Sequence, residues 1–397
     1  MLTRVHSLTG SYVRALDDDR LHWTPPGRIH YSALTEFNLL ESKGYVLDGD
    51  WDRLEKPFEN LDVYVAFREV LVEKRKWQQT VYYQRLLARI QRGEMPWGCR
   101  TQEDLDQRCA KLSALAEAIG AGGYKSQTEL HPIVAGNPFA GKDEITVSIG
   151  REGDLLFSNS AHRLAAAKVL GIPQVPIRIA VRHRAWLAFR RELEAYAAAN
   201  GGLLPQPALH PDLSHIPARR DCVERLDLLC PHLPPAPARI LVVGAELGYE
   251  CHRLEDLGYG CFTGEANGEI HPFLGRLRRA ENRRFHIVPE PLLTWSALPD
   301  LSFDAVLLTR SFPWELAHDQ RRCRLAHFLR MLRTPLLFLE GPASPGCRSN
   351  AAPPAPYGGA PDEDAPNVLL SFVRAETRLG QVACIGFVGD TPLYKFN

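Results

Sequence analysis

The polar turn Asn159-Ser160-Ala161-His162-Arg163 is the part of the chain with the most chemical potential. It stands between an apolar, strand-like segment and an alanine-rich segment typical of a helix. Free backbone N–H groups and the positive end of the helix dipole favour an anion where a helix begins. Arg163 offers a planar fork for two phosphate oxygens, and His162 can exchange a proton near neutral pH. These residues predict a phosphate-binding turn.

A second candidate site follows the apolar run Arg239 to Val243. Gly244-Ala245-Glu246-Leu247-Gly248 comes directly after this run, and a helical stretch from about Tyr249 to Leu257 comes next. Glu265 stands 21 residues after Gly244, a spacing at which a carboxylate can hold the ribose hydroxyls of an adenosine cofactor. The order of strand, loop, helix, strand and acid predicts cofactor binding by Gly244, Glu246, Gly248 and Glu265.

The overall composition excludes some classes of protein. Lys+Arg and Asp+Glu both number 47 among the 397 residues, so no net charge attracts nucleic acid or an anionic membrane. We find no apolar run long enough to span a bilayer and no secretory signal, so we expect a cytoplasmic protein. Nine cysteines without a C-x-x-C pair predict neither a disulfide framework nor a zinc site, and we expect no protein-bound metal.

Two kinds of hydrophobic period mark the elements of the first half. Thr101 and Asp104 form a capping box before a helix that runs to about Gly120. Alternation over 145–149 and the segment 155–157 predict two strands, and a helix from about His162 and a strand over 175–181 follow. We expect a small α+β module here, preceded by a mostly helical region.

The second half alternates strands with helical stretches, which predicts a parallel sheet with helices on its faces. Expected strands lie at 239–243, 261–263, 285–288, 303–308 and 336–339. A proline-containing connection at 201–238 reads as a linker. We therefore expect a two-domain α/β and α+β fold, divided as follows: a helical region over 1–130, the α+β module over 131–200, a linker over 201–238, and a Rossmann-like domain over 239–397 with a Pro/Gly-rich insertion at 341–366. Composition leaves two readings of this insertion, disorder or a lid.

The module resembles the ParB/sulfiredoxin-like superfamily. The resemblance rests on the run from Ile149 to Phe157 and on the motif residues after it, which are Asn159, His162-Arg163-Leu164, Ala166-Ala167, Leu170-Gly171 and Val175-Pro176. It implies a nucleotide-binding turn, because members include CTP-binding partition proteins, ATP-using sulfiredoxins and free-serine kinases. The resemblance thus implies ATP or CTP with Mg²⁺ as cofactor.

The turn departs from the superfamily's commonest form, since Asn159 stands where Asp is frequent and Ser160 where Gly is frequent. A carboxylate base would then come from outside the turn, and we choose Glu144. The catalytic candidates are Glu144, His162 and Asn159. The candidates for phosphate binding are Ser160, Arg163, Arg151, Arg182 and His183. A purely structural reading also stays open, in which the His-Arg pair caps the turn and meets a surface carboxylate.

Residues from about 216 to 397 resemble class I S-adenosylmethionine-dependent methyltransferases. The strand at Arg239–Val243, its glycine loop and Glu265 carry this resemblance, which implies S-adenosylmethionine as cofactor. Val242 stands where such enzymes commonly have Asp, so a non-catalytic domain stays an alternative. His271, Glu315 and His318 follow expected strand ends where a methyl acceptor would bind.

These patterns together predict a transferase: a nucleotide-dependent phosphotransferase fused to a methyltransferase-like domain, acting on a small-molecule or glycan hydroxyl. Two alternatives remain. The first is a methyltransferase whose front half only binds substrate or nucleotide. The second is a CTP- or ATP-gated, DNA-associated binding protein, although zero net charge and the lack of a helix-turn-helix pattern argue against a nucleic-acid partner. The pattern indicates no membrane partner and does not determine the oligomeric state.

Overall fold

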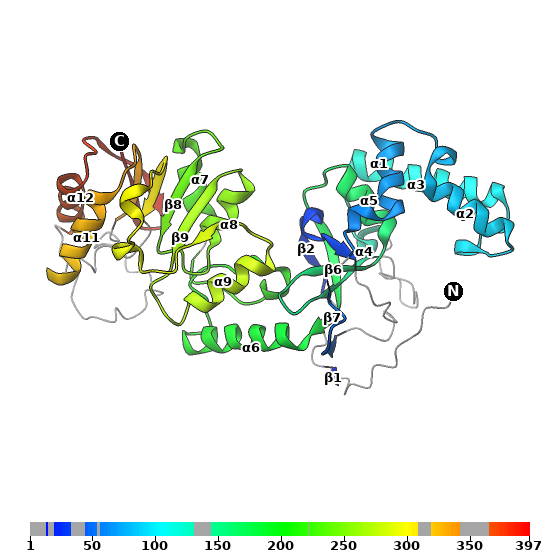
Figure 1. Ribbon diagram of the computed structural model, residues 1–397, viewed down its shortest axis with the longest axis horizontal. Coiled ribbons are helices and arrows are strands. Elements are labelled where there is room, and N and C mark those ends of the chain that lie inside the picture. Colours follow the sequence, from blue (N-terminus) through cyan, green and yellow to red (C-terminus); the bar gives the residue numbers. More distant parts are fainter. Residues whose placement is uncertain are drawn as a thin grey trace. The chain divides into compact units, whose positions relative to one another are not determined.

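The computed structural model describes residues 13–14, 20–32, 44–53, 56–130, 144–220, 222–308, 319–341 and 365–397. The chain divides into two compact units, residues 1–192 and 193–397. Each unit is built around its own mixed or parallel sheet, with helices packed on it (Figure 1). The α/β and α+β fold class predicted from the sequence is therefore confirmed.

The first unit contains a seven-stranded sheet among its described residues, in the order β1-β4-β7-β5-β6-β3 with β2 also paired to β7. Its strands are β1 (Val13–Arg14), β2 (His22–Thr24), β3 (Tyr31–Ser32), β4 (Tyr45–Leu47), β5 (Ile145–Ile149), β6 (Leu155–Asn159) and β7 (Val175–His183). β5 and β6 form an antiparallel hairpin, and β5 runs parallel to β7. The strands expected within 145–181 are confirmed.

The helices of the first unit include α5, which follows the polar turn. They are α1 (Asp62–Leu71), α2 (Val81–Gln91), α3 (Gln102–Gly122), α4 (Gln127–Leu130) and α5 (Ala161–Val169), with short 3-10 turns at Pro26–Arg28, Phe58–Asn60, Trp77–Gln79 and Pro96–Gly98. The expected capping box of α3 is present, because Thr101 and Asp104 bond each other's backbone N–H groups. α5 contacts α1, α3 and β5, and its residues from Leu164 to Ala167 are fully buried.

The predicted boundary at residue 130 does not appear in the structure. Strands from the first 50 residues pair with strands of the expected α+β module: β2 and β4 both bond β7, and β3 bonds β6. A strand of two or three residues is too short to show an alternating pattern, so these strands could not be recognised from the residue pattern. The N-terminal region and the module therefore form one unit.

The second unit contains a seven-stranded sheet in the order β10-β9-β8-β11-β12-β14-β13, again among its described residues. The strands are β8 (Arg239–Val243), β9 (Gly260–Gly264), β10 (His286–Ile287), β11 (Ala305–Leu308), β12 (Leu337–Glu340), β13 (Val382–Val388) and β14 (Thr391–Phe396). The first five in this order are parallel, and β14 and β13 close the sheet in antiparallel fashion. This is the doubly wound arrangement predicted from the alternating elements.

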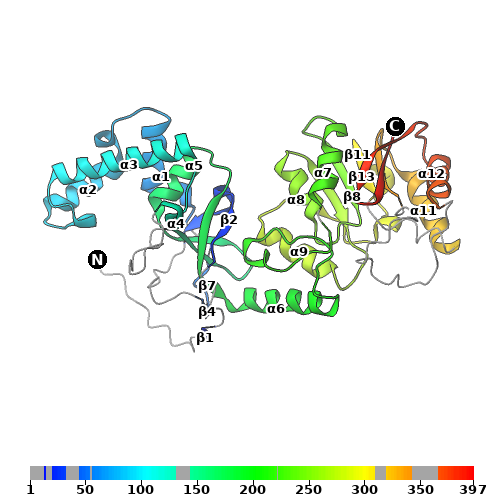
Figure 2. The ribbon, with the colours of Figure 1, turned by 180° about the vertical axis from the view of Figure 1, so that it is seen from behind.

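Helices cover both faces of this sheet (Figures 1 and 2). α7 (Val223–Leu229), α8 (Tyr249–Asp256) and α9 (His271–Ala280) pack on one face, and α11 (Asp319–Met331) and α12 (Ala365–Glu376) pack on the other. Two clusters of buried side chains result. Neighbouring strand residues alternate between them: Val306 and Leu308 belong to one cluster, and Ala305 and Leu307 belong to the other. Burial on both faces explains why the central strands read as unbroken apolar runs.

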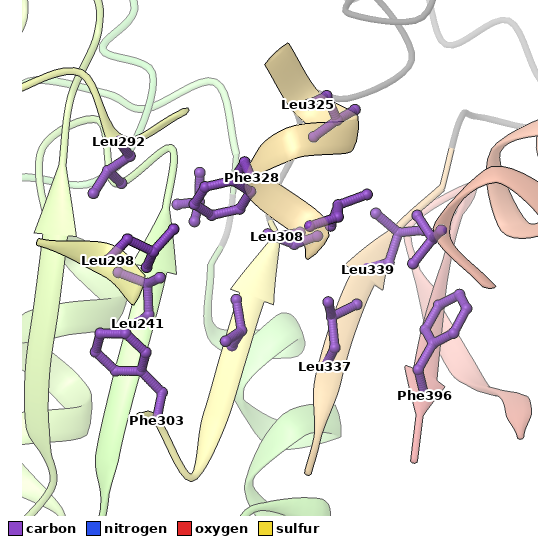
Figure 3. Close-up of a cluster of buried hydrophobic side chains, with 14 of the residues drawn as sticks. Leu241, Leu292, Leu298, Phe303, Leu308, Leu325, Phe328, Leu337, Leu339 and Phe396 are labelled. Carbon is purple, nitrogen blue, oxygen red and sulfur yellow. The ribbon is translucent and has the colours of Figure 1, made fainter. Parts of the chain in front are cut away.

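Figure 3 shows the cluster on the α11 face, where Leu325 and Phe328 of α11 meet Leu241, Leu308 and Leu337 of the sheet. Phe328 is fully buried, and side chains of this size contribute about 1.5–3 kcal/mol each when they leave water. The cluster fixes the central strands, and therefore fixes the loops that leave their carboxyl ends.

The segment expected to be a linker, 201–238, belongs to the second unit. It contains α7 and the short turns Pro211–Leu213 and Cys230–His232. Cys222, Leu226 and Leu229 are buried in the cluster on the α7 and α8 face. Prolines interrupt the polar and apolar residues of this segment. The residue pattern therefore does not show that the apolar side chains are buried.

α6 (Arg184–Ala199) begins in the first unit and ends in the second, and short turns lie at Leu292–Thr294 and Leu298–Asp300. The expected insertion at 341–366 falls almost wholly outside the described residues, as do Glu315 and His318. None of the described helices has the length and apolar character needed to cross a membrane.

Candidate functional site

The polar turn of the first unit opens α5 as the sequence predicts, with Ser160 at the N-cap. Ser160 lies in the left-handed region (φ 70°, ψ 47°), where glycine is favoured, and its side chain does not cap the helix. Serine adopts this conformation less readily than glycine does. Asn159 ends β6 beside Thr146 of β5, and its side chain is exposed.

Arg163 is held by oxygen atoms of neutral groups. Its Nε donates to the Tyr124 hydroxyl at 3.0 Å, and its Nη2 donates to the Lys125 carbonyl at 3.2 Å. With the Gln127 amide turned to satisfy its neighbours, the amide oxygen also accepts from Arg163. The guanidinium also lies 5.1 Å from the centre of the Tyr124 ring. No carboxylate forms an ion pair with Arg163 among the described residues, so its positive charge stays available to an anion.

Glu144 reaches the same segment from the other side. It is fully buried, and one of its carboxylate oxygens accepts the backbone N–H of Gln127. Burial raises the pKa of Tyr124, with the charge of Glu144 acting in the same direction and that of Arg163 opposing it. Residues 124–127 thus bring Glu144 and Arg163 together. The sequence pattern indicated no role for Tyr124 or Gln127.

His162 lies in an aromatic environment. Its Nε2 is 2.6 Å from the Tyr82 hydroxyl, and its ring contacts those of Phe67, Tyr82 and Trp97. Burial lowers the pKa of His162 to about 4, and the charge of Arg108 acts in the same direction. The imidazole is therefore neutral at pH 7, and it joins α5 to α2.

Arg151, Arg182 and His183 lie at the opposite end of the strands from Arg163. Arg151 is in the β5–β6 turn, and Ile149, the last residue of β5, pairs with Arg182 of β7. A strand of five residues spans about 17 Å. Glu144, Asn159, Ser160, His162 and Arg163 stand at the other end, so the predicted residues form two separate groups.

The second group has its own partners. Arg151 bonds both oxygens of the buried Asp52 carboxylate and also bonds Asp50. His183 uses both ring nitrogens, with Nε2 3.0 Å from the Gly49 carbonyl and Nδ1 accepting the Ala185 N–H. These contacts attach the loop after β4 to the sheet. Phosphate binding by Arg151, Arg182 and His183 stays a prediction.

In the second unit, the glycine loop and Glu265 meet at the carboxyl ends of β8 and β9. Val243 pairs with Gly264, so Gly244 and Glu265 follow neighbouring strand ends. One Glu265 carboxylate oxygen accepts the Glu246 N–H at 2.8 Å and the other accepts the Asn267 N–H at 2.8 Å. The predicted acid therefore joins the loop after β8 to the loop after β9.

The glycines of this loop are required by its geometry. Gly244 and Gly248 have φ of 81° and 86°. A Cβ at Gly248 would come within 2.7 Å of Leu274. The close packing of α9 against the start of α8 leaves no room for a side chain there.

Glu246 is the third predicted residue of the loop, and its backbone also has a positive φ of 50°. Its Oε1 lies 3.5 Å from the Arg220 guanidinium, and its Oε2 is buried without a hydrogen-bond partner among the described residues. Burial raises the pKa of Glu246 to about 7, and Glu250 and Glu265 add to the rise while Arg220 opposes it. This carboxyl group titrates near physiological pH.

The position of Val242 explains why it is apolar. Its side chain is fully buried in the cluster on the α7 and α8 face, away from the loop. His271, one of the candidate residues for the methyl acceptor, begins α9 with its Nδ1 3.3 Å from the Glu265 carbonyl. Arg220, Arg225 and Gln206 also approach the loop, although the sequence placed them in a linker.

The pKa of Glu246 predicts a pH effect on stability. Its folded-state pKa of about 7 lies above the ordinary value of 4.5, so the folded protein binds this proton more tightly than the unfolded chain. The contribution of this proton to the free energy of unfolding is complete below pH 4.5. It falls by up to about 3 kcal/mol as the pH rises to 7.

Unfolding by urea at pH 5 and pH 8 measures this effect. Glu246→Gln should be more stable relative to the wild type at pH 8 than at pH 5, because glutamine does not titrate. Glu269→Gln, in an exposed position nearby, should show the same difference from wild type at both pH values. A Glu246→Gln difference that does not change with pH would contradict the prediction.

Comparison with solved structures shows distant similarities. No family model and no curated protein matches the chain. One similar solved structure is that of WbdD with the kinase inhibitor LY294002, at 16% identity and a TM-score of 0.39 over 51% of this chain and 47% of that chain. Another is the N-terminal domain of EvdMO1 with SAH bound, at 13% identity and a TM-score of 0.37 over 52% and 96%. A third is a TehB-like SAM-dependent methyltransferase from Corynebacterium glutamicum, at 12% identity and a TM-score of 0.31 over 54% and 98%.

The chain spans less than half the length of the WbdD structure. WbdD is described as a bifunctional kinase-methyltransferase. TM-scores this low carry no functional argument. The fold of the second unit is instead established by its own strand order, a doubly wound parallel sheet closed by an antiparallel pair.

Proposed function

We propose that the second unit binds S-adenosylmethionine and catalyses methyl transfer. The observation that carries this proposal is the charge at the carboxyl ends of its strands. Among the described residues, Glu246 lies near Arg220, Glu250 and Glu340 pair with Arg225, and Glu265 lies beside Glu246, so these six groups together carry a formal charge of −2 when all are ionised. Such a site favours a cationic cofactor and repels the phosphates of a dinucleotide.

The residues present fit this cofactor. The Glu265 carboxylate accepts one N–H on each oxygen, and each oxygen has a further lone pair for a ribose hydroxyl. Gly244 and Gly248 allow the backbone to approach the ligand. The buried Oε2 of Glu246 faces no donor of the described chain, which suits a site that receives positive charge. The strand order supports this position for the site, because β9 and β11 pair with β8 on opposite sides and ligands commonly bind where the strand order reverses.

When bound, S-adenosylmethionine supplies a methyl group that its sulfonium already activates. The chain then has to orient the cofactor and the acceptor and to exclude water. Glu265 would fix the ribose, and the glycine loop would fix the distance between the cofactor and β8. His271 stands at the start of α9 beside Glu265 and would face the acceptor.

Titration calorimetry with S-adenosylmethionine, NAD and ATP tests this assignment. The proposed site in the second unit should bind S-adenosylmethionine. It should not bind NAD, because the carboxylates of the site repel the pyrophosphate of NAD. No heat with S-adenosylmethionine would remove the methyltransferase proposal and would favour a structural second unit. Preferential binding of NAD would show that the charge at the strand ends was interpreted wrongly.

A second function is favoured by Arg163 in the first unit. A guanidinium held by neutral oxygen atoms at the start of a nine-residue helix has the charge and the setting to bind phosphate. We propose that this turn binds ATP or CTP with Mg²⁺ and transfers a phosphoryl group to the hydroxyl of a small molecule or glycan. Glu144 would accept the proton of that hydroxyl, and the neutral His162 would position α5.

Incubation with radiolabelled ATP and CTP separates the alternatives for the first unit. Slow hydrolysis or transfer of the terminal phosphate supports a phosphotransferase. Binding without turnover supports a nucleotide-binding module that serves the methyltransferase, and tighter DNA binding in the presence of CTP supports a gated DNA-associated protein. Binding of neither nucleotide removes the phosphotransferase proposal.

A further inference from the structure

Arg225 forms a buried network directly behind the cofactor loop of the second unit. It lies on α7, is 0% exposed, and donates to two carboxylates, Glu250 and Glu340. Glu250 is fully buried and Glu340 is 5% exposed. Although burial opposes its charge, these two acids raise the pKa of Arg225 above its ordinary value. The guanidinium of Arg225 therefore stays charged.

The network connects the two parts of the sheet edge that would face the cofactor. Glu250 is in the first turn of α8, two residues after Gly248, and Glu340 ends β12. Arg225 Nη2 is 3.1 Å from a Glu340 oxygen, and Arg225 Nη1 bonds Glu250. α7 and α8 lie beside β8 in Figure 2. The guanidinium thus links the end of the glycine loop to the far side of β11.

Gln206 extends this network to the backbone of the loop. Its amide nitrogen donates to the second Glu250 oxygen at 2.8 Å, and its amide oxygen accepts the Tyr249 N–H at 3.2 Å. Tyr249 is the first residue of α8 after the left-handed Gly248. Hydrogen bonds therefore run from the Arg225 guanidinium through Glu250 and Gln206 to the first residue of α8.

Stability alone does not explain a network of this kind. Taking charges out of water costs several kcal/mol each, and apolar side chains of similar volume often stabilise a protein as well or better. A buried ionic network does have directional bonds, which hold neighbouring segments in one arrangement. Its place behind the glycine loop shows which segments these are.

We propose that Arg225 is a positioning residue that holds the loop 244–248 and the start of α8 in the arrangement that binds the cofactor. This inference rests on the proposed function of the second unit. Arg225 does not touch the cofactor, and its effect passes through Glu250, Gln206 and Glu340. Replacing the three charged groups with apolar ones should leave a folded protein whose loop is held less firmly.

The variant R225M/E250L/E340L tests this proposal against the control R330M/E376L. The control removes an ion pair of 2.6 Å between α11 and α12, on the other face of the same sheet. The apolar triple variant should unfold at a temperature no lower than the wild type does. It should bind S-adenosylmethionine about 10-fold more weakly, a smaller loss than the one expected when a group is misplaced by a full ångström. The control should bind like the wild type. Unchanged affinity in a folded triple variant would overturn the proposal.

Hydrogen exchange in the ligand-free protein gives a second readout that does not depend on the cofactor. Amides of residues 248–252 should exchange about 10-fold faster in the triple variant, because their local opening becomes easier, and those of β11 should not change. Failure of the wild type to bind S-adenosylmethionine would remove the proposed function, whereas unchanged exchange would remove the role of Arg225. If the triple variant does not fold, E340Q replaces it, with Arg225 still paired to Glu250 and about a 3-fold effect expected on both measurements.

Discussion

Replacing Glu265 with glutamine is expected to weaken S-adenosylmethionine binding at least about 100-fold. Hydrogen bonds to a charged group contribute about 1.5–3 kcal/mol each, and the carboxylate would accept the ribose hydroxyls while it holds the loops after β8 and β9 through the N–H groups of Glu246 and Asn267. A glutamine presents one NH₂ group to donors that need an acceptor. Both the ribose contact and the loop are therefore affected.

Calorimetric titration of purified protein measures the effect, with Glu269→Gln as the matched control. Glu269 lies four residues further on, is exposed and has the same chemistry, so its substitution should leave the affinity unchanged. Thermal unfolding of both variants shows whether the second unit stays folded. If Glu265→Gln is folded and binds as tightly as the wild type, Glu265 does not hold the ribose.

Replacing Arg163 with methionine is expected to weaken binding of ATP and CTP by about 100-fold, because a bidentate, charge-assisted contact to phosphate is lost. Methionine keeps much of the length of the side chain and can still pack against the Tyr124 ring. Arg163→Lys keeps the charge but loses the planar fork, and should have a smaller effect of about 10-fold.

Titration with each nucleotide in the presence of Mg²⁺ measures these affinities, and inorganic pyrophosphate serves as a probe without a base. Arg100→Met is the control, since Arg100 is exposed in the same unit. The wild type and Arg100→Met should bind equally. If the wild type and Arg163→Met bind the nucleotide with equal affinity, the nucleotide binds elsewhere.

The two proposed sites differ in electrostatic character, which makes their predictions independent. Arg163 presents positive charge, surrounded by neutral oxygen atoms at the start of a helix. The groups around the loop after β8, namely Glu246, Glu250, Glu265, Glu340, Arg220 and Arg225, instead include two more carboxylates than guanidiniums. A phosphate-bearing ligand should therefore prefer the first unit and a cationic one the second. Competition between ATP and S-adenosylmethionine is accordingly not expected.

The residue pattern was sufficient to predict the elements whose structure depends on residues close to one another in the sequence. The apolar runs of β8 and β11, the capping box of α3 and the glycine loop could be recognised because burial on both faces, helix ends and positive φ values each restrict residue type locally. The same reasoning placed Glu265 beside Gly244, since neighbouring parallel strands end at one edge of a sheet. It also placed Ser160 and Arg163 at the start of α5.

Only the tertiary structure determined which distant residues meet. The register of β5 and β7 put Arg182 at the end of the sheet opposite to Arg163, although both had been assigned to phosphate binding. Arg225, which lies in the segment predicted to be a linker, bonds Glu340, 115 positions further along the chain. Buried charges leave no periodic pattern along a chain, because their partners are selected by packing between elements far apart in sequence. The sequence therefore determined the elements and the types of side chain at their ends, and packing determined which of those side chains share a site.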